Sequence, residues 1–313
     1  METVQRAGDA DIVELIEVGP RDGLQSHPHF IDTETKLAFI HRLVAAGVKR
    51  IEAVSFVNPR RVPQMADADE IIKGLPRGTG TRFIGLVLNT RGFERAAACG
   101  LTEINSVVVA TETFSQRNQG MSVSAILDSV TRIAREARKA GIFCGVTIAA
   151  AFGCPYEGRV DPARVVELAR RLVALDIDEI ALADSIGVAV PADITRLVQA
   201  VDKVRGTTSL RLHFHNTRNM AIANLYAALQ AGVRAFDASC GGVGGCPFAP
   251  GATGNVATED VLYLLENMHY TTGISLPGII ATTHWLETPL GMPLPAAVSR
   301  AKPFPPTVVA AAS

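Results

Sequence analysis

Residues 123–149 read VSAILDSVTRIAREARKAGIFCGVTIA, and they contain both elements of a repeating unit. The first part, Val123–Ala140, has the pattern of a helix, and Gly141 stands where such a helix would turn back. The last part, Phe143–Ala149, is a short apolar run that predicts a buried strand. This stretch therefore predicts a fold in which helices and strands alternate.

The same unit recurs along the chain, and further glycines end helical patterns at Gly47, Gly100 and Gly232. The predicted strands are Ile12–Val18, Arg50–Ser55, Phe83–Leu88, Glu103–Val109, Phe143–Ala149, Glu179–Ala183, Leu210–His215 and Ala235–Ala238. The predicted helices are Thr33–Ala46, Gln64–Lys73, Gly92–Ala98, Val123–Ala140, Pro162–Ala174, Ala192–Val204, Met220–Ala231 and Thr258–Asn267. Eight strand–helix units predict a single-domain (β/α)8 TIM barrel over residues 1–300, with a Pro-rich tail over 301–313. An open doubly wound sheet is the alternative, but no Gly-x-Gly-x-x-Gly follows the first strand.

The composition is that of a globular enzyme. Hydrophobic residues make up 48% of the chain and charged residues 19%, which excludes a disordered chain. The net charge of −1 gives no field that would attract nucleic acid or an anionic membrane. The chain has no apolar run long enough to span a membrane and no apolar signal core near Met1. Five cysteines without a Cys-x-x-Cys pair argue against a disulfide framework. We expect a cytoplasmic protein, and barrels of this type often form homodimers.

Residues that bind metals lie where barrel active sites form, at the carboxyl ends of strands. Asp22 follows the first predicted strand, and His213 and His215 end the seventh. Because side chains alternate along a strand, the two histidines point the same way. With Asn255 on a later loop, they offer two imidazoles, a carboxylate and an amide oxygen. This set suits a divalent cation such as Mg²⁺, Mn²⁺ or Zn²⁺, although a lone His-x-His is often structural.

Other polar residues fall at the same predicted end of the barrel. Arg21, beside Asp22, is either a structural ion-pair partner or a group that holds an oxyanion. Glu17 and Glu52 are candidates to orient Arg21, since a buried carboxylate needs a partner. Three more candidates belong to other strands: Ser55 lies on the second predicted strand, Asn118 follows the fourth and Asp184 follows the sixth.

Cys246 stands in the glycine-rich segment 241–247, GGVGGCP. A lone cysteine is usually a small buried hydrophobe. The flanking glycines indicate instead a loop that could close over a substrate and bring a thiol to it as proton donor or acceptor.

Together these motifs resemble the 3-hydroxy-3-methylglutaryl-CoA lyase family of metal-dependent aldolase-type barrels, from about Val13 to about Gly273. The stretches that carry the resemblance are Glu17–Gln25, Ser55–Val57, Gly153–Gly158, Asp184–Gly187, His213–His215 and Gly241–Asp260. The segment from Gly241 is the most discriminating, because the related condensing synthases lack a Gly-Gly-Cys-Pro loop.

The resemblance implies cleavage of a 3-hydroxy-3-methylacyl-CoA to acetyl-CoA and a keto acid, which is acetoacetate for 3-hydroxy-3-methylglutaryl-CoA. It implies a place in leucine degradation and ketone-body formation. It also implies Mg²⁺ or Mn²⁺, held by the four ligand candidates, and Arg21 on the thioester oxygen. Cys246 would move protons, with His213 as a possible relay, and Glu52 and Asp184 would orient the metal-site residues. Ser55 and Asn118 are substrate-binding candidates.

The chain departs from the family pattern at Asn216, at the end of the fifth strand and in the segment Ser26–His29. Because of these differences, the resemblance does not define which acyl group the substrate carries, and citramalyl-CoA is an alternative substrate. A condensing acyl-CoA transferase and a non-catalytic metal-binding barrel are the other readings of the same residues.

Overall fold

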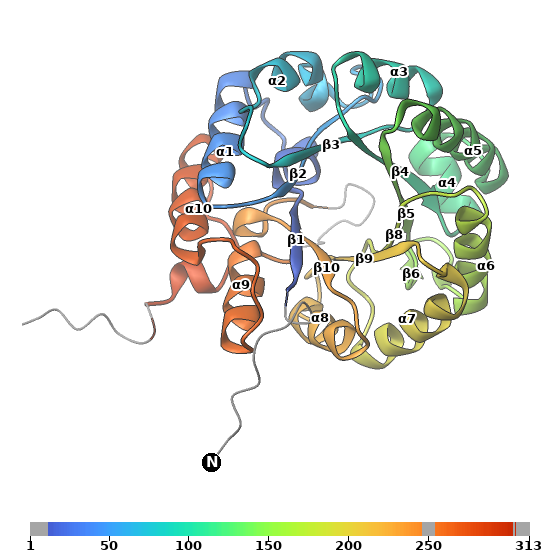
Figure 1. Ribbon diagram of the computed structural model, residues 1–313. Helices are drawn as coiled ribbons and strands as arrows, with labels where there is room; N and C mark the ends of the chain where they lie inside the picture. Colours follow the sequence, from blue (N-terminus) through green and yellow to red (C-terminus); the bar gives the residue numbers. More distant parts are fainter. Residues whose placement is uncertain (1–11, 246–253, 303, 305–313) are drawn as a thin grey trace, which may run out of the picture.

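A closed barrel of parallel strands forms the centre of the molecule. The computed structural model describes residues 12–245, 254–302 and 304. In order around the barrel, the strands are β1 (Glu14–Glu17), β10 (Ala235–Ala238), β9 (Ser209–Phe214), β8 (Glu179–Asp184), β5 (Phe143–Ala149), β4 (Glu103–Val109), β3 (Arg82–Leu86) and β2 (Arg50–Ser55). Figure 1 shows the helices as a ring around these strands. The prediction of a (β/α)8 barrel is confirmed.

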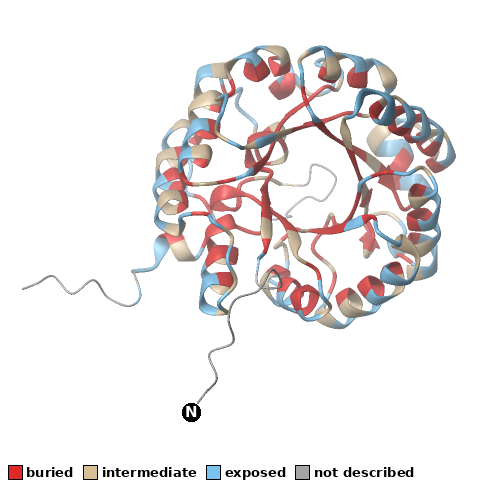
Figure 2. Ribbon diagram, viewed as in Figure 1, coloured by how far each residue is buried: buried red, intermediate tan, exposed pale blue. Residues whose placement is uncertain are grey.

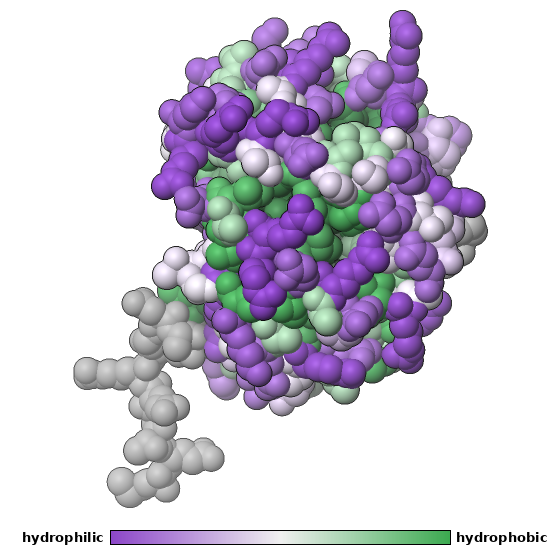
Figure 3. All heavy atoms as spheres, turned by 90° about the vertical axis from the view of Figure 1, so that its right-hand side faces the viewer, coloured by the Kyte–Doolittle hydropathy of each residue, from purple (hydrophilic) through white to green (hydrophobic). Residues whose placement is uncertain are grey.

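The helices bury the sides that face the barrel and expose their outer sides, as Figure 2 shows. They are α1 (Thr33–Ala45), α2 (Ala68–Gly74), α3 (Thr90–Ala98), α4 (Glu112–Gln119), α5 (Val123–Ala140), α6 (Pro162–Val173), α7 (Pro191–Arg205), α8 (Ala221–Gln230), α9 (Thr258–Asn267) and α10 (Leu276–Leu290). Figure 3 shows one outer face, where hydrophilic side chains surround smaller hydrophobic areas.

Helix α5 illustrates how the local sequence sets the element bounds. The Ser122 hydroxyl accepts a hydrogen bond from the Ala125 N–H and caps the helix start. Ile126, Val130 and Ile133 are buried, at the spacing of one helical face. At the other end Gly141 adopts a φ of 65°, a left-handed conformation that costs glycine little.

Some elements differ from the prediction. The predicted helix Gln64–Lys73 is divided into a 3₁₀ turn at Pro63–Met65 and helix α2, because Asp67 between them has non-helical backbone angles. Its carboxylate is bonded to Lys36 and Thr33 of α1. Helix α4, helix α10 and the two-stranded β6 (Gly153–Cys154) and β7 (Gly158–Arg159) were not predicted. Helix α4 is mostly polar, so its sequence has no apolar periodicity to recognise.

The interior of the barrel is charged toward the amino ends of its strands. Arg50 of β2 and Arg211 of β9 are among the most deeply buried side chains of the described chain. Their partners include the buried carboxylates Glu103 of β4 and Glu179 of β8. Such charges are stable in a barrel only when they are paired.

Within the described residues, no helix is both long and apolar enough to cross a bilayer.

Candidate active site

Arg21 and Asp22 lie on a π-helical turn, Gly19–Gly23, that follows the carboxyl end of β1. The Val18 carbonyl accepts hydrogen bonds from the N–H groups of both Asp22 and Gly23. Turns of this kind are rare and occur often at functional sites. Here the turn ends the strand early and places two consecutive charged side chains at the barrel mouth.

His213 and His215 come from the end of β9 and have neighbouring rings, with 5.1 Å between the ring centroids. One potential ligand atom from each histidine and one from Asp22 all lie within 4.8 Å of one another. Asn255 reaches the same place through a backbone bridge to His215, and its Nδ2 donates to Asp22 Oδ2 at 2.9 Å. The structure therefore brings together the four residues that the sequence predicted as metal ligands.

The donor set fits a divalent cation. Asn255 Oδ1 is buried and has no hydrogen-bond partner among the described residues. A buried carbonyl oxygen without a partner is costly, and a bound cation would remove that cost. The carboxylate, the two imidazoles and this oxygen form a mixed nitrogen and oxygen set without thiolate, which suits Mg²⁺, Mn²⁺ or Zn²⁺.

The charges around Asp22 keep it ionised. Burial raises its pKa, but Arg21, His213 and His215 lower it by more, so that the pKa falls to about 2. An ionised carboxylate is the form that binds a metal ion.

Arg21 is held by Glu52 of β2. Its Nε donates to Glu52 Oε2 at 3.0 Å, and its Nη1 donates to Asp22 Oδ1 at 2.7 Å. Asn105 of β4 donates to the other oxygen of Glu52 at 3.3 Å. Burial lowers the pKa of Arg21, but Glu52 and Asp22 raise it by more, so the guanidinium stays charged. A fixed guanidinium next to the metal-ligand candidates can bind a substrate oxygen that becomes negative.

Glu17 does not contact Arg21. Its carboxylate accepts hydrogen bonds from the backbone N–H groups of Gly19 and Cys240 and from the Thr258 hydroxyl. Burial raises its pKa to about 7, although these three donors act in the opposite direction. Glu17 thus joins the π-helical turn to the end of β10, below the site.

Asp184 faces its own loop. Its two oxygens accept hydrogen bonds from the N–H groups of Val188 and Ala189, at 3.0 and 2.9 Å. Burial raises its pKa above the ordinary value despite these donors. The carboxylate therefore holds the turn after β8, while the backbone carbonyl of Asp184 accepts from the His215 N–H.

The remaining predicted residues are placed differently. Ser55 ends β2, is fully buried, and its hydroxyl has no hydrogen-bond partner within the described part of the chain. Asn118 lies half-buried in α4, and no hydrogen bond between described residues joins it to the metal-ligand cluster. Cys246 lies outside the described residues.

Asp237 of β10 is a site residue that the sequence analysis missed. Its Oδ2 lies 3.0 Å from His213 Nδ1, and its Oδ1 accepts from Arg211 Nη1 at 2.6 Å. Burial raises the pKa of Asp237, but Arg211 and His213 lower it by more. Burial lowers the pKa of His213, but Asp237 and Asp22 together raise it by more, so that the pKa lies above its ordinary value. The alternation of side chains along the strand indicates that Arg211 and His213 both face the barrel interior. No local sequence pattern indicates that a residue on β10 would be their partner.

Fold and side chains together define the class: a (β/α)8-barrel enzyme with an acidic and imidazole ligand set at the carboxyl ends of its strands. The HMGL-like family model matches residues 12–285. The chain belongs to this family.

Characterised relatives cover nearly the whole chain. It is 44% identical to (R)-citramalyl-CoA lyase of Chloroflexus aurantiacus, over 96% of this chain and 98% of that protein. It is 40% identical to hydroxymethylglutaryl-CoA lyase YngG of Bacillus subtilis, over 90% of this chain and 95% of that one. The structure of an HMG-CoA lyase from Acinetobacter baumannii, in complex with coenzyme A and 3-methylmalate, matches with a TM-score of 0.90 at 36% identity. That match covers 94% of this chain and 96% of the other. The prediction of a carbon–carbon lyase of this family is confirmed.

Proposed function

We propose that this protein cleaves 3-hydroxy-3-methylglutaryl-CoA to acetyl-CoA and acetoacetate. The observation that carries the proposal is the cluster of Asp22, His213 and His215 with the Arg21 guanidinium beside it. This arrangement lies in a chain whose relatives include a hydroxymethylglutaryl-CoA lyase at 40% identity. Acetyl-CoA and acetoacetate would connect the reaction to leucine degradation and ketone-body formation.

Asp22, His213, His215 and Asn255 would hold the cation, with Mg²⁺ or Mn²⁺ as first choice and Zn²⁺ as second. When bound, a divalent cation lowers the pKa of a coordinated hydroxyl group and neutralises carboxylate charge. Asp22 and Asn255 would supply oxygen ligands, and oxygen ligands favour Mg²⁺ and Mn²⁺ over Zn²⁺.

Arg21 would bind the thioester oxygen. In the cleavage step the bond between C2 and C3 of the acyl group breaks, the hydroxyl loses its proton and becomes the keto group, and C2 receives the electron pair. The thioester oxygen then carries negative charge as an enolate, and a fixed guanidinium stabilises this charge. Glu52, supported by Asn105, keeps Arg21 in place.

Two proton transfers complete the reaction. One removes the hydroxyl proton and the other delivers a proton to C2 of the acetyl-CoA enolate. We assign the second to the Cys246 thiol and the first to a relay through His213 or Cys246. Ser55 would hydrogen-bond the substrate through its unpartnered hydroxyl, Asn118 would contact its outer part, and Asp184 would keep the loop after β8 in position.

Citramalyl-CoA is the second candidate substrate, and the 44% identity to (R)-citramalyl-CoA lyase favours it. The two acyl-CoA molecules share the thioester, the CH₂ group and the carbon that bears the hydroxyl and methyl groups. They differ by one CH₂ before the terminal carboxylate, so the bond-breaking residues would serve both. We further infer that the protein works as a homodimer in the cytoplasm.

The test is acetyl-CoA release by the purified protein, with Mg²⁺ or Mn²⁺ and with an EDTA control. 3-Hydroxy-3-methylglutaryl-CoA and citramalyl-CoA are offered separately, and acetoacetate and pyruvate are measured as the second products. Metal-dependent release of acetoacetate supports the proposal. Acetyl-CoA release from citramalyl-CoA alone would make citramalyl-CoA the substrate. No acetyl-CoA release from either compound would overturn both proposed substrates.

A further inference from the structure

Asp237 lies between a metal-ligand candidate and a buried arginine. On β9 the side chains of Arg211 and His213 are two positions apart and therefore point to the same side of the strand, into the barrel. Asp237 is the direct neighbour of His213 on β10 in the register of the two strands. One of its oxygens faces His213 Nδ1 at 3.0 Å and the other faces Arg211 Nη1 at 2.6 Å. The carboxylate thus has a separate partner for each oxygen.

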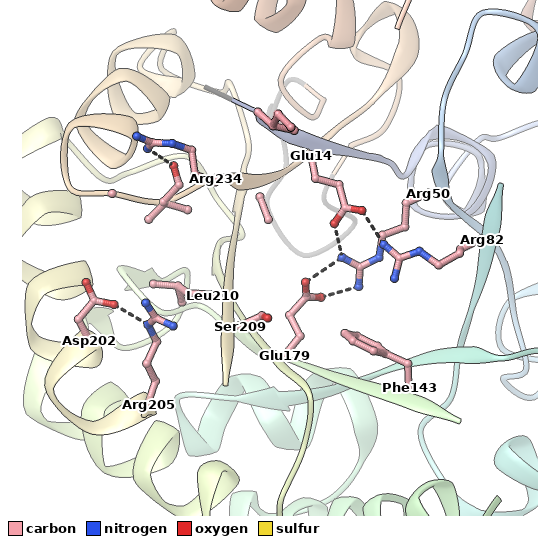
Figure 4. Close-up of a pocket in the computed structure, with 14 residues that line it drawn as sticks. Glu14, Arg50, Arg82, Phe143, Glu179, Asp202, Arg205, Ser209, Leu210 and Arg234 are labelled. Atoms are coloured by element: carbon pink, nitrogen blue, oxygen red, sulfur yellow. Dashed lines mark hydrogen bonds and ion pairs between the residues drawn. The ribbon is translucent and has the colours of Figure 1, made fainter. Parts of the chain in front are cut away.

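Arg211 is in turn fixed from its other side. Its Nε lies 2.9 Å from Glu179 Oε1 of β8, and its side chain is 1% exposed. Glu179 also binds Arg50, which lies next to Glu14 and Arg82 at the amino ends of the strands. Glu14, Arg50, Arg82 and Glu179 line a pocket of about 620 Å³. Figure 4 shows their side chains directed toward one another. A row of alternating charges therefore extends from that end of the barrel to His213.

The contact with Asp237 determines which nitrogen of the His213 imidazole is free to bind a metal. A histidine binds a metal through a nitrogen that carries no proton, and the other nitrogen is normally held by a carboxylate or carbonyl oxygen. Asp237 occupies Nδ1 of His213, so the proton belongs on Nδ1 and Nε2 is left for the metal. Because Arg211 holds the second oxygen of Asp237, the carboxylate cannot rotate away from the ring.

We propose that Asp237 is the positioning residue of the metal centre, which fixes the tautomer and direction of the His213 ring, and that Arg211 fixes Asp237. This inference rests on the proposed function, because it assumes that His213 is a metal ligand. The alternative is that Arg211 and Asp237 are only a buried ion pair that fills the barrel.

The test compares Asp237→Asn with Asp67→Asn in the full-length protein, both stripped of metal. Asp67 belongs to another buried ion pair, with Lys36 at 2.9 Å, between α1 and α2. Mn²⁺ binding is measured by titration followed by electron paramagnetic resonance. We expect Asp237→Asn to weaken Mn²⁺ binding about 10–100-fold, the usual cost of losing such an outer partner. Asp67→Asn should lower stability without changing Mn²⁺ affinity. Equal Mn²⁺ affinities for Asp237→Asn and the unchanged protein would overturn the inference.

A second measurement does not depend on the folding of a variant. In the metal-free, ¹⁵N-histidine-labelled protein above pH 9, the nitrogen chemical shifts of His213 report which nitrogen carries the proton. A proton on Nδ1 supports the inference, and a proton on Nε2 overturns it. Mn²⁺ binding with this tautomer but without lyase activity would leave the inference intact and overturn the proposed function. If the unchanged protein binds no Mn²⁺, both fall together.

Discussion

Arg21 and Glu52 form a buried ion pair between the π-helical turn after β1 and strand β2. The Arg21 Nε lies 3.0 Å from Glu52 Oε2, and Nη2 donates to the same oxygen. Glu52 is 1% exposed, so this ion pair is screened little by solvent. Glu52 therefore holds two of the three guanidinium nitrogens of Arg21, and Asp22 holds the third.

Substitution Glu52→Gln should lower kcat about 100-fold with a smaller change in KM. The amide keeps the shape of the side chain but not its charge, and a displaced catalytic group commonly costs this much. Steady-state kinetics with the preferred acyl-CoA give both constants. The matched control is Glu103→Gln, because Glu103 is an equally buried carboxylate paired with Arg50 at the other end of the barrel. Similar losses of kcat in both variants would mean that Glu52 acts only through stability.

Substitution Asp22→Asn should weaken Mn²⁺ binding by more than about 100-fold, beyond the usual 10–100-fold cost of losing an outer-shell partner. The reason is the loss of the one carboxylate in the ligand set, whose pKa of about 2 keeps it ionised at neutral pH. Calorimetric titration of the metal-free protein measures the affinity. Asp193→Asn, at a half-buried position in the first turn of α7, serves as the control and should bind Mn²⁺ normally. Retained affinity in Asp22→Asn would place the metal elsewhere.

Substitution Glu17→Gln should remove a pH dependence of stability. The pKa of Glu17 is raised to about 7 in the folded protein, so between about pH 4.5 and 7 the folded state holds a proton that the unfolded state has lost. The free energy of unfolding therefore falls as pH rises through this range, by about 3 kcal/mol from this group. Urea unfolding at pH 5, 6 and 7.5 gives the slope for the unchanged protein and for Glu17→Gln.

The exposed residue Glu70 provides the control for this measurement, and Glu70→Gln should keep the slope of the unchanged protein. The same slope in Glu17→Gln would show that Glu17 is ionised throughout the range. Glu259, whose pKa burial also raises, would then be the next group to substitute.

The sequence predicts the barrel well because its signals are local. Strand β5 and helix α5 begin and end at the predicted residues, since apolar runs and a terminal glycine define them without reference to the rest of the chain. The first strand is shorter than predicted, Glu14–Glu17 in place of Ile12–Val18. At its carboxyl end Val18 already caps the π-helical turn, and at its amino end Ile12 forms only an isolated bridge, to Thr271. No sequence pattern predicts that turn.

The sequence predicts only part of the site, because only some of the site's features have local sequence signals. Asp22, His213 and His215 are selected by residue type and by their place at strand ends, and Asn255 by its place on a later loop; the structure brings all four close together. The link from Asp237 to His213 is not predicted, because it depends on which strands become neighbours when the barrel closes. Asp184 lies where the sequence placed it, but its carboxylate binds its own loop, a preference that only the backbone geometry determines.

Substitution Cys246→Ala should lower turnover on the order of 10²–10⁴-fold, the usual contribution of one positioned proton donor. Mn²⁺ affinity should stay unchanged, because the proposed ligands, Asp22, His213, His215 and Asn255, include no thiolate. Parallel measurement of kcat and of Mn²⁺ binding separates the two effects. Cys99→Ala is the control, since this thiol lies at the end of α3 and contacts Asp69. A Cys246→Ala variant with normal turnover would transfer the proton role to another group.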